Sequence, residues 1–91
     1  MGSDPARHPD VSRLVADRLR RDPEDPDALF ALAAVRATEG RFQESIDVLD
    51  RLVGINPRYP GVWRLKEKVY TLSGALEQAA RCRIQAAEDE G

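Results

Sequence analysis

The chain has 91 residues, which is enough for one domain and too few for two independent hydrophobic cores. Hydrophobic residues make up 42% of it but aromatic residues only 5%, so its core must consist of aliphatic and alanine side chains, as in close-packed helices. Its 14 basic and 16 acidic residues give a net charge of -2 without a polybasic block, which argues against nucleic acid or a membrane surface as a partner.

Residues 1–8 are expected to form a flexible tail ahead of a single helical domain over residues 9–88. The first ten residues carry charge and proline where a secretory signal needs an apolar stretch. The longest apolar run, Ala28 to Val35, is far shorter than the roughly 20 residues that span a membrane. We therefore expect a cytoplasmic protein, or an excised piece of a larger one.

Residues that commonly hold metals or cofactors are scarce. His8 is the only histidine and Cys82 the only cysteine, so neither an internal disulfide nor a structural metal site of these residues is available. The glycines nowhere form a phosphate-binding loop. We expect no cofactor, assign Cys82 to packing, and expect no enzymatic activity, because no base, nucleophile and oxyanion-binding group can be found together.

Apolar residues recur about every 3.6 positions, which predicts helices and no sheet. The first predicted helix, residues 9–21, has an apolar face of Val11, Leu14, Val15 and Leu19. The second, residues 26–38, starts with a proline in its first turn, has Asp25 as its expected cap and ends at Gly40. Because this second helix is apolar almost all round, we expect neighbours on more than one of its sides.

Three further helices follow. The third, residues 42–54, is ended by the Asn56-Pro57 pair. The fourth, residues 60–72, contains Trp63, which we expect to bury the most surface and to cost about 3 to 5 kcal/mol when truncated to alanine. The fifth, residues 75–88, has a weaker apolar face and a charged, fraying end; that face consists of Leu76, Ala79, Ala80, Ile84 and Ala87.

Prolines, glycines and apolar residues recur at an offset of 34 positions. The pairs at this offset are Pro23 with Pro57, Pro26 with Pro60, Gly40 with Gly74, Leu29 with Trp63, and Val35 with Val69. The chain therefore divides into two full repeats, residues 26–59 and 60–91, after a half repeat over residues 9–25 that ends in a matching Asp-Pro pair.

A 34-residue helix-turn-helix unit with glycine at its turn and proline at its exit resembles the tetratricopeptide repeat family. The first unit matches through Leu29, Leu32, Gly40, Phe42, Ile46, Leu49 and Pro57. The second matches through Trp63, Tyr70, Gly74, Leu76, Ala79 and Ala86. The resemblance implies an all-α fold, a right-handed superhelical stack of antiparallel helix pairs that forms an α-solenoid of about five helices.

The chain departs from the family pattern at Arg36, Lys66, Glu67 and Arg83. Arg83 stands where the family prefers a large apolar residue, and the rest of the fifth helix offers small alanines to a following unit. Two interpretations follow. Either this helix is a cap with Arg83 facing water, or the parent protein continues beyond it.

The resemblance implies a concave groove lined by the first helix of each repeat. Its lining residues are expected to be Asp27, Phe30, Ala31, Ala34, Thr38, Arg64, Lys68 and Thr71. Arg64 and Lys68 lie one turn apart, so both would point the same way beside a shallow apolar floor. They would then contact a peptide, or instead belong to a solvated face paired with acids such as Glu67. Tyr59 would either close the seam between repeats or project toward a ligand.

These features predict a non-catalytic protein-protein interaction module that binds a partner peptide or protein segment in its concave groove. Cations beside an apolar floor suit a peptide with a hydrophobic anchor followed by an acidic or carboxylate group. A fifth helix with a charged, water-facing side favours a monomer over a homo-oligomer. The alternative is a structural or self-associating segment of a longer solenoid protein.

Overall fold

The computed structural model describes residues 9–90, which form five helices and contain no strand. The helices are α1 (Pro9–Arg21), α2 (Pro26–Thr38), α3 (Phe42–Ile55), α4 (Val62–Ser73) and α5 (Leu76–Glu90). This confirms the all-α prediction with five helices. The predicted flexible tail and the last residue of the second repeat lie outside the described residues.

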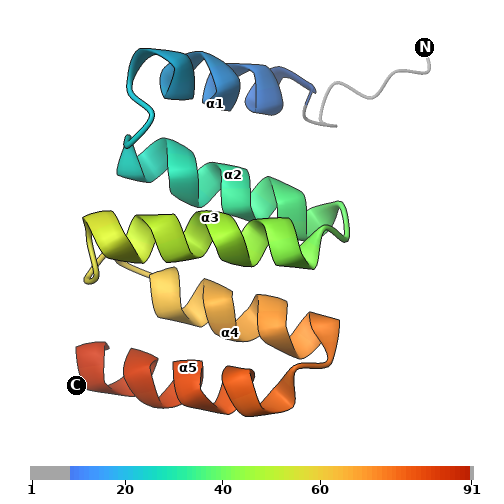
Figure 1. Cartoon of the computed structure of the whole chain (residues 1–91), viewed down its shortest axis with the longest axis vertical. Coiled ribbons are helices and arrows are strands. Elements are labelled where there is room, and N and C mark those ends of the chain that lie inside the picture. The colour runs from blue at the N-terminus through green and yellow to red at the C-terminus, as the bar shows by residue number, and fades with distance from the viewer. Residues whose placement is uncertain (1–8, 91) are drawn as a thin grey trace.

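Successive helices run in opposite directions and lie side by side in chain order, as Figure 1 shows. Each helix packs against the next, and α2 also contacts α4. The expectation that the second helix has neighbours on more than one side is therefore confirmed, since α2 touches α1, α3 and α4. Contacts between neighbours supply the core because a single short helix has too little apolar surface to be stable alone.

Local signals placed several helix ends correctly. The carboxylate of Asp25 accepts a hydrogen bond from the backbone N–H of Ala28 at 3.1 Å and so caps α2. This bond, with help from Arg18, holds the pKa of Asp25 below its usual value. After α2 and after α4, Gly40 and Gly74 adopt φ values of 78° and 86°, a left-handed conformation that favours glycine.

The fourth helix begins later than the repeat predicts. Pro26 opens α2, but its counterpart Pro60 lies in a turn, and α4 starts only at Val62. Gly61 causes the delay because its φ of 85° cannot continue a right-handed helix. A Cβ at Gly61 would lie 3.6 Å from the Phe30 ring, so the backbone also passes close to α2 at this point.

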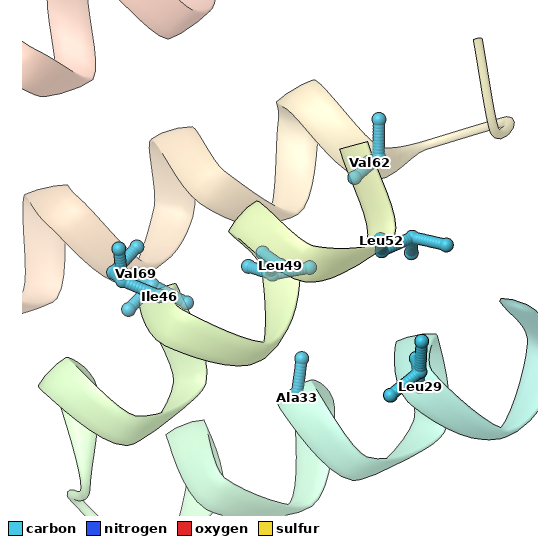
Figure 2. Close-up of a cluster of buried hydrophobic side chains, with 7 residues drawn as sticks. All are labelled: Leu29, Ala33, Ile46, Leu49, Leu52, Val62 and Val69. Atoms are coloured by element: carbon cyan, nitrogen blue, oxygen red, sulfur yellow. The ribbon is translucent and has the colours of Figure 1, made fainter. Parts of the chain in front are cut away.

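The core is a cluster of buried side chains from three helices (Figure 2). Its members are Leu29 and Ala33 from α2, Ile46, Leu49 and Leu52 from α3, and Val62 and Val69 from α4. Ser45 is also buried, and its hydroxyl donates to the Ala33 carbonyl at 2.7 Å, which satisfies the hydroxyl inside the core. The core thus joins α2 and α4 through α3, which lies between them.

The buried face of α5 matches the predicted one only at Ala79 and, in part, at Ala80. Ala79, Cys82 and Ala86 are buried, which confirms the packing role assigned to the cysteine, whereas Leu76 and Ile84 are 65% and 61% exposed. Small side chains let α5 approach α4 closely, so the alanine face is turned inward instead of the leucine and isoleucine face. The helix also continues to Glu90, two residues beyond its predicted end at residue 88.

The predicted apolar face of α1 is only partly covered. Val15 is buried and Leu19 is half-buried against the core, but Val11 and Leu14 are exposed by 43% and 63%. The reason is that α2 is the neighbour of α1 among the described helices and covers one side of it. A one-sided apolar pattern therefore overstated how much of α1 is buried.

Trp63 is only partly buried. Its ring packs against the edge of the core, and its indole N–H donates to the Pro57 carbonyl at 3.2 Å. The largest fully buried side chains are leucines and valines instead. The cost of about 3 to 5 kcal/mol expected for truncating Trp63 to alanine remains a prediction.

We expect the largest loss of stability from truncation at Leu49, whose side chain is fully buried in the core. Leu49→Ala should lower the free energy of unfolding by about 2 to 5 kcal/mol, since it removes apolar contacts and leaves a cavity. Leu14→Ala is the matched control and should change it by less than about 0.5 kcal/mol. Urea denaturation measures both, and similar losses for the two variants would contradict the described core.

Candidate functional site

A cavity of about 300 Å³ lies where the loop between α3 and α4 meets the end of α5. Its walls are formed by Arg58, Tyr59, Pro60, Gly61, Trp63, Arg64, Ala86 and Asp89. Two aromatic rings, a proline and an alanine give it apolar surface, while two guanidinium groups and one carboxylate supply charge. Concave sites with apolar walls and a few polar groups are typical of ligand binding.

The start of α4 adds to the positive charge at this cavity. Gly61, the residue before the helix, and the first-turn residues Trp63 and Arg64 all line it. No side chain caps this helix end. The first backbone N–H groups of a helix carry a partial positive charge, which attracts anions. Arg58 and Arg64 supply positive charge to the cavity wall, and Asp89 supplies a negative charge.

Tyr59 connects the cavity to α2. Its hydroxyl donates a hydrogen bond to the Asp27 carboxylate at 2.6 Å, and its ring lies 5.1 Å from that of Phe30. The Asp27 carboxylate raises the pKa of Tyr59 to about 12, because an ionised phenolate would lose this bond and be repelled. Tyr59 therefore closes the seam between the two helix pairs, and it also lines the cavity.

The structure brings only some of the predicted groove residues to this place. Asp27 and Phe30 meet Tyr59, and Arg64 lines the cavity. The other predicted residues are half-buried or exposed elsewhere, and they are Ala31, Ala34, Thr38, Lys68 and Thr71. The hydroxyls of Thr38 and Thr71 donate to carbonyls of their own helices at 2.7 and 2.8 Å.

The acid that was expected to pair with Arg64 and Lys68 has a different partner. Glu67 accepts a hydrogen bond from Arg83 of α5 at 3.0 Å. Arg83 is exposed, as predicted for a water-facing residue, but it also bridges α4 and α5. Of the residues that line the cavity, only Arg64 was predicted to line a groove, and Tyr59 was one that would either close the seam or project toward a ligand. The antiparallel helix pairs that the resemblance implies bring the end of the fifth helix to the start of the fourth, but no motif marks these residues as a binding site.

Lys66 is the polar residue whose role the sequence did not reveal. It is only 8% exposed, and its ammonium lies 2.7 Å from the Asp50 carboxylate of α3. The ammonium also lies 4.9 Å from the centre of the Trp63 ring and 6.0 Å from that of Tyr70. The signal was present, because Lys66 stands 34 positions after Leu32 and breaks the apolar pattern there. Its partner, Asp50, is exposed.

The described residues contain no group of histidine, cysteine, aspartate and glutamate that could hold a metal ion. None of the five helices is long and apolar enough to cross a membrane. Burial raises the pKa of the Cys82 thiol, which disfavours the reactive thiolate.

Comparisons of the chain with protein-family models, curated proteins and solved structures found no match. The site is therefore interpreted from its own geometry.

The hydrogen bond between Tyr59 and Asp27 predicts a pH dependence of stability. The folded state holds the Tyr59 proton up to about pH 12, whereas an unfolded tyrosine loses it near its ordinary pKa of about 10. The stabilisation is thus complete below pH 10 and is lost as the pH rises toward 12. Tyr59→Phe should remove this decline, which denaturant titrations at increasing pH would measure.

Ultraviolet absorbance provides a second measurement, since the chain has two tyrosines. The wild-type protein should show an ionisation near pH 12 that is missing in Tyr59→Phe. If Tyr59→Phe still showed the ionisation near pH 12, with only a lower amplitude, the described hydrogen bond would be contradicted.

Lys66 allows a test of its ion pair with Asp50, in which the lysine is buried and the aspartate is exposed. Lys66→Leu introduces the residue found 34 positions earlier, Leu32, and should leave the free energy of unfolding unchanged or raise it, because apolar packing replaces the buried ammonium while the Asp50 carboxylate stays in contact with water. Lys66→Ala should lower it by about 1 to 3 kcal/mol through lost packing around Trp63. Urea denaturation compares the two, and a larger loss for leucine than for alanine would show that the charge itself is needed.

Proposed function

We propose that the five helices form a right-handed superhelical α-solenoid of the tetratricopeptide kind, with repeats 26–59 and 60–91 after a half repeat 9–25. Two observations support this. The helix pair α4–α5 follows the pair α2–α3, with α5 starting 34 residues after α3, and the glycines after their first helices, Gly40 and Gly74, are also 34 residues apart and have nearly equal φ values of 78° and 86°. The contact between α2 and α4 is also expected when the first helices of successive pairs line one side of a stack.

The function that the site supports best is a non-catalytic interaction module for a peptide or protein segment with an acidic or carboxylate group. The observation that carries this proposal is the cavity in which Arg58 and Arg64 lie beside the rings of Tyr59 and Trp63. Guanidinium groups bind carboxylates through paired hydrogen bonds, and aromatic walls accept an apolar side chain. The ligand is thus expected to present an apolar side chain next to its acid group.

Asp89 adds a limit to this recognition. Its carboxylate lies in the same wall and repels a second acidic group of the ligand. A single carboxylate, such as the C-terminus of a peptide, therefore fits better than a run of acids. The proposal includes a cytoplasmic location and no cofactor. The raised pKa of Cys82, which disfavours a nucleophilic thiolate, agrees with a role outside catalysis.

Trp63 offers a direct measurement, because it is the only tryptophan and lines the cavity. Synthetic peptides that end in an aromatic or aliphatic residue with a free carboxylate should change its fluorescence, and the same peptides with an amidated C-terminus should bind at least about tenfold more weakly. Arg58→Glu combined with Arg64→Glu should abolish binding through charge repulsion.

Two control variants make the outcome specific. Arg13→Glu changes the charge on an exposed residue of α1 and should leave peptide binding unchanged. Lys68→Glu separates the cavity from the rest of the predicted groove: loss of binding in this variant alone would move the site away from the cavity. If no peptide of either kind changes the fluorescence, the alternative of a segment from a longer solenoid is favoured.

A further inference from the structure

The outer side of α5 carries exposed apolar side chains that no described helix covers. Leu76 and Ile84 are 65% and 61% exposed, and Leu72, at the end of α4, is 56% exposed. Leu76, Ala80 and Ile84 are spaced by four residues and therefore lie along one stripe of the helix. The other side of α5, formed by Ala79, Cys82 and Ala86, is the one that is buried. This helix thus has two apolar sides, of which one is exposed.

Charged residues border this stripe in a self-complementary order. Glu77 and Arg81 are both exposed and lie four residues apart, so they share one edge of the stripe. Arg83, on the other edge, is bound to Glu67 of its own chain. An acid and a base on one edge can pair with the same two residues of a second copy only if the two helices run in opposite directions.

The spacing fits such an antiparallel pair with a twofold axis at Ala80. The side chain of Leu76 would then face Ile84 of the second copy, and the two Ala80 residues would meet where the helices approach most closely. Along the helix axis, Glu77 would lie about 3 Å from Arg81 of the second copy, given a rise of about 1.5 Å per residue. Long side chains span this distance, so two symmetric ion pairs would form.

From this complementarity we infer that α5 joins two copies of the chain in an antiparallel homodimer. A twofold interface uses the same patch on both copies, and this patch supplies both the apolar stripe and both signs of charge. The monomer expected from the sequence assumed a charged, water-facing α5, but the exposed side contains Leu76 and Ile84. Asp89, in the cavity wall, follows Ala80 by nine residues and so lies on the opposite side of α5, which leaves the cavity open in the dimer.

The mass in solution tests the inference directly. Light scattering over a wide dilution series should show a dimer for the wild-type chain. Ile84→Glu should raise the dimer dissociation constant at least about 100-fold, because two apolar contacts are lost per dimer. Leu14→Glu, an equally exposed change on α1, should leave it unaffected. Circular dichroism checks that both variants are folded. A wild-type monomer at all concentrations would overturn the inference.

A charge exchange tests the antiparallel register. Glu77→Arg alone and Arg81→Glu alone place like charges opposite each other in a homodimer, so each should weaken dimerisation about tenfold. A mixture of the two variants pairs arginines with glutamates at both sites and should form a heterodimer of near wild-type affinity. If the mixture stays as weak as the single variants, the proposed register is wrong. Peptide binding by Ile84→Glu, measured through Trp63, would show that the module proposal stands independently.

Discussion

The described structure depends on the burial of α3 between its two neighbours. Leu49 and Leu52 are completely buried and Ile46 is 5% exposed, and the other core side chains come from α2 on one side and α4 on the other. No single helix of this length is stable alone, so each contact between neighbours supports the next. The loop from Asn56 to Gly61 leaves the end of α3, and its position therefore follows from the α3–α4 contact. The cavity, which this loop lines, exists only when that contact has formed.

The cavity arises where the start of α4 differs from the start of α2. At the start of α2, Asp25 caps the helix and Pro26 opens it. At the equivalent point the chain has Gly61 in a left-handed conformation, so α4 starts at Val62 and has no side-chain cap. Tyr59 fills the seam by binding Asp27 and contacting Phe30. The loop before α4 thus holds the two helix pairs together through Tyr59, and its Gly61 leaves the start of α4 without a side-chain cap.

Much of the local structure could be predicted from the sequence, because it depends on neighbours in the chain. The five helices, the Asp25 cap and the left-handed glycines at positions 40 and 74 follow from periodicity and from capping rules. The cavity and the Lys66–Asp50 pair could not be predicted, because they depend on which helices lie opposite. In α5 the periodicity allowed two apolar faces. Hydrophobicity favoured Leu76 and Ile84, whereas close packing on α4 selected Ala79, Cys82 and Ala86.

The two sides of α5 connect the two proposals. Ala86 and Asp89 belong to the cavity, while Leu76 and Ile84 lie on the exposed side that we assign to the dimer. A dimer of this kind carries two cavities at a fixed separation, with neither blocked by the interface. Once a ligand with two acidic segments has bound one cavity, the second encounter is intramolecular, and the affinity of the pair exceeds that of a single site if the linker spans the two. A weak single cavity would therefore be sufficient for tight binding to a bivalent partner.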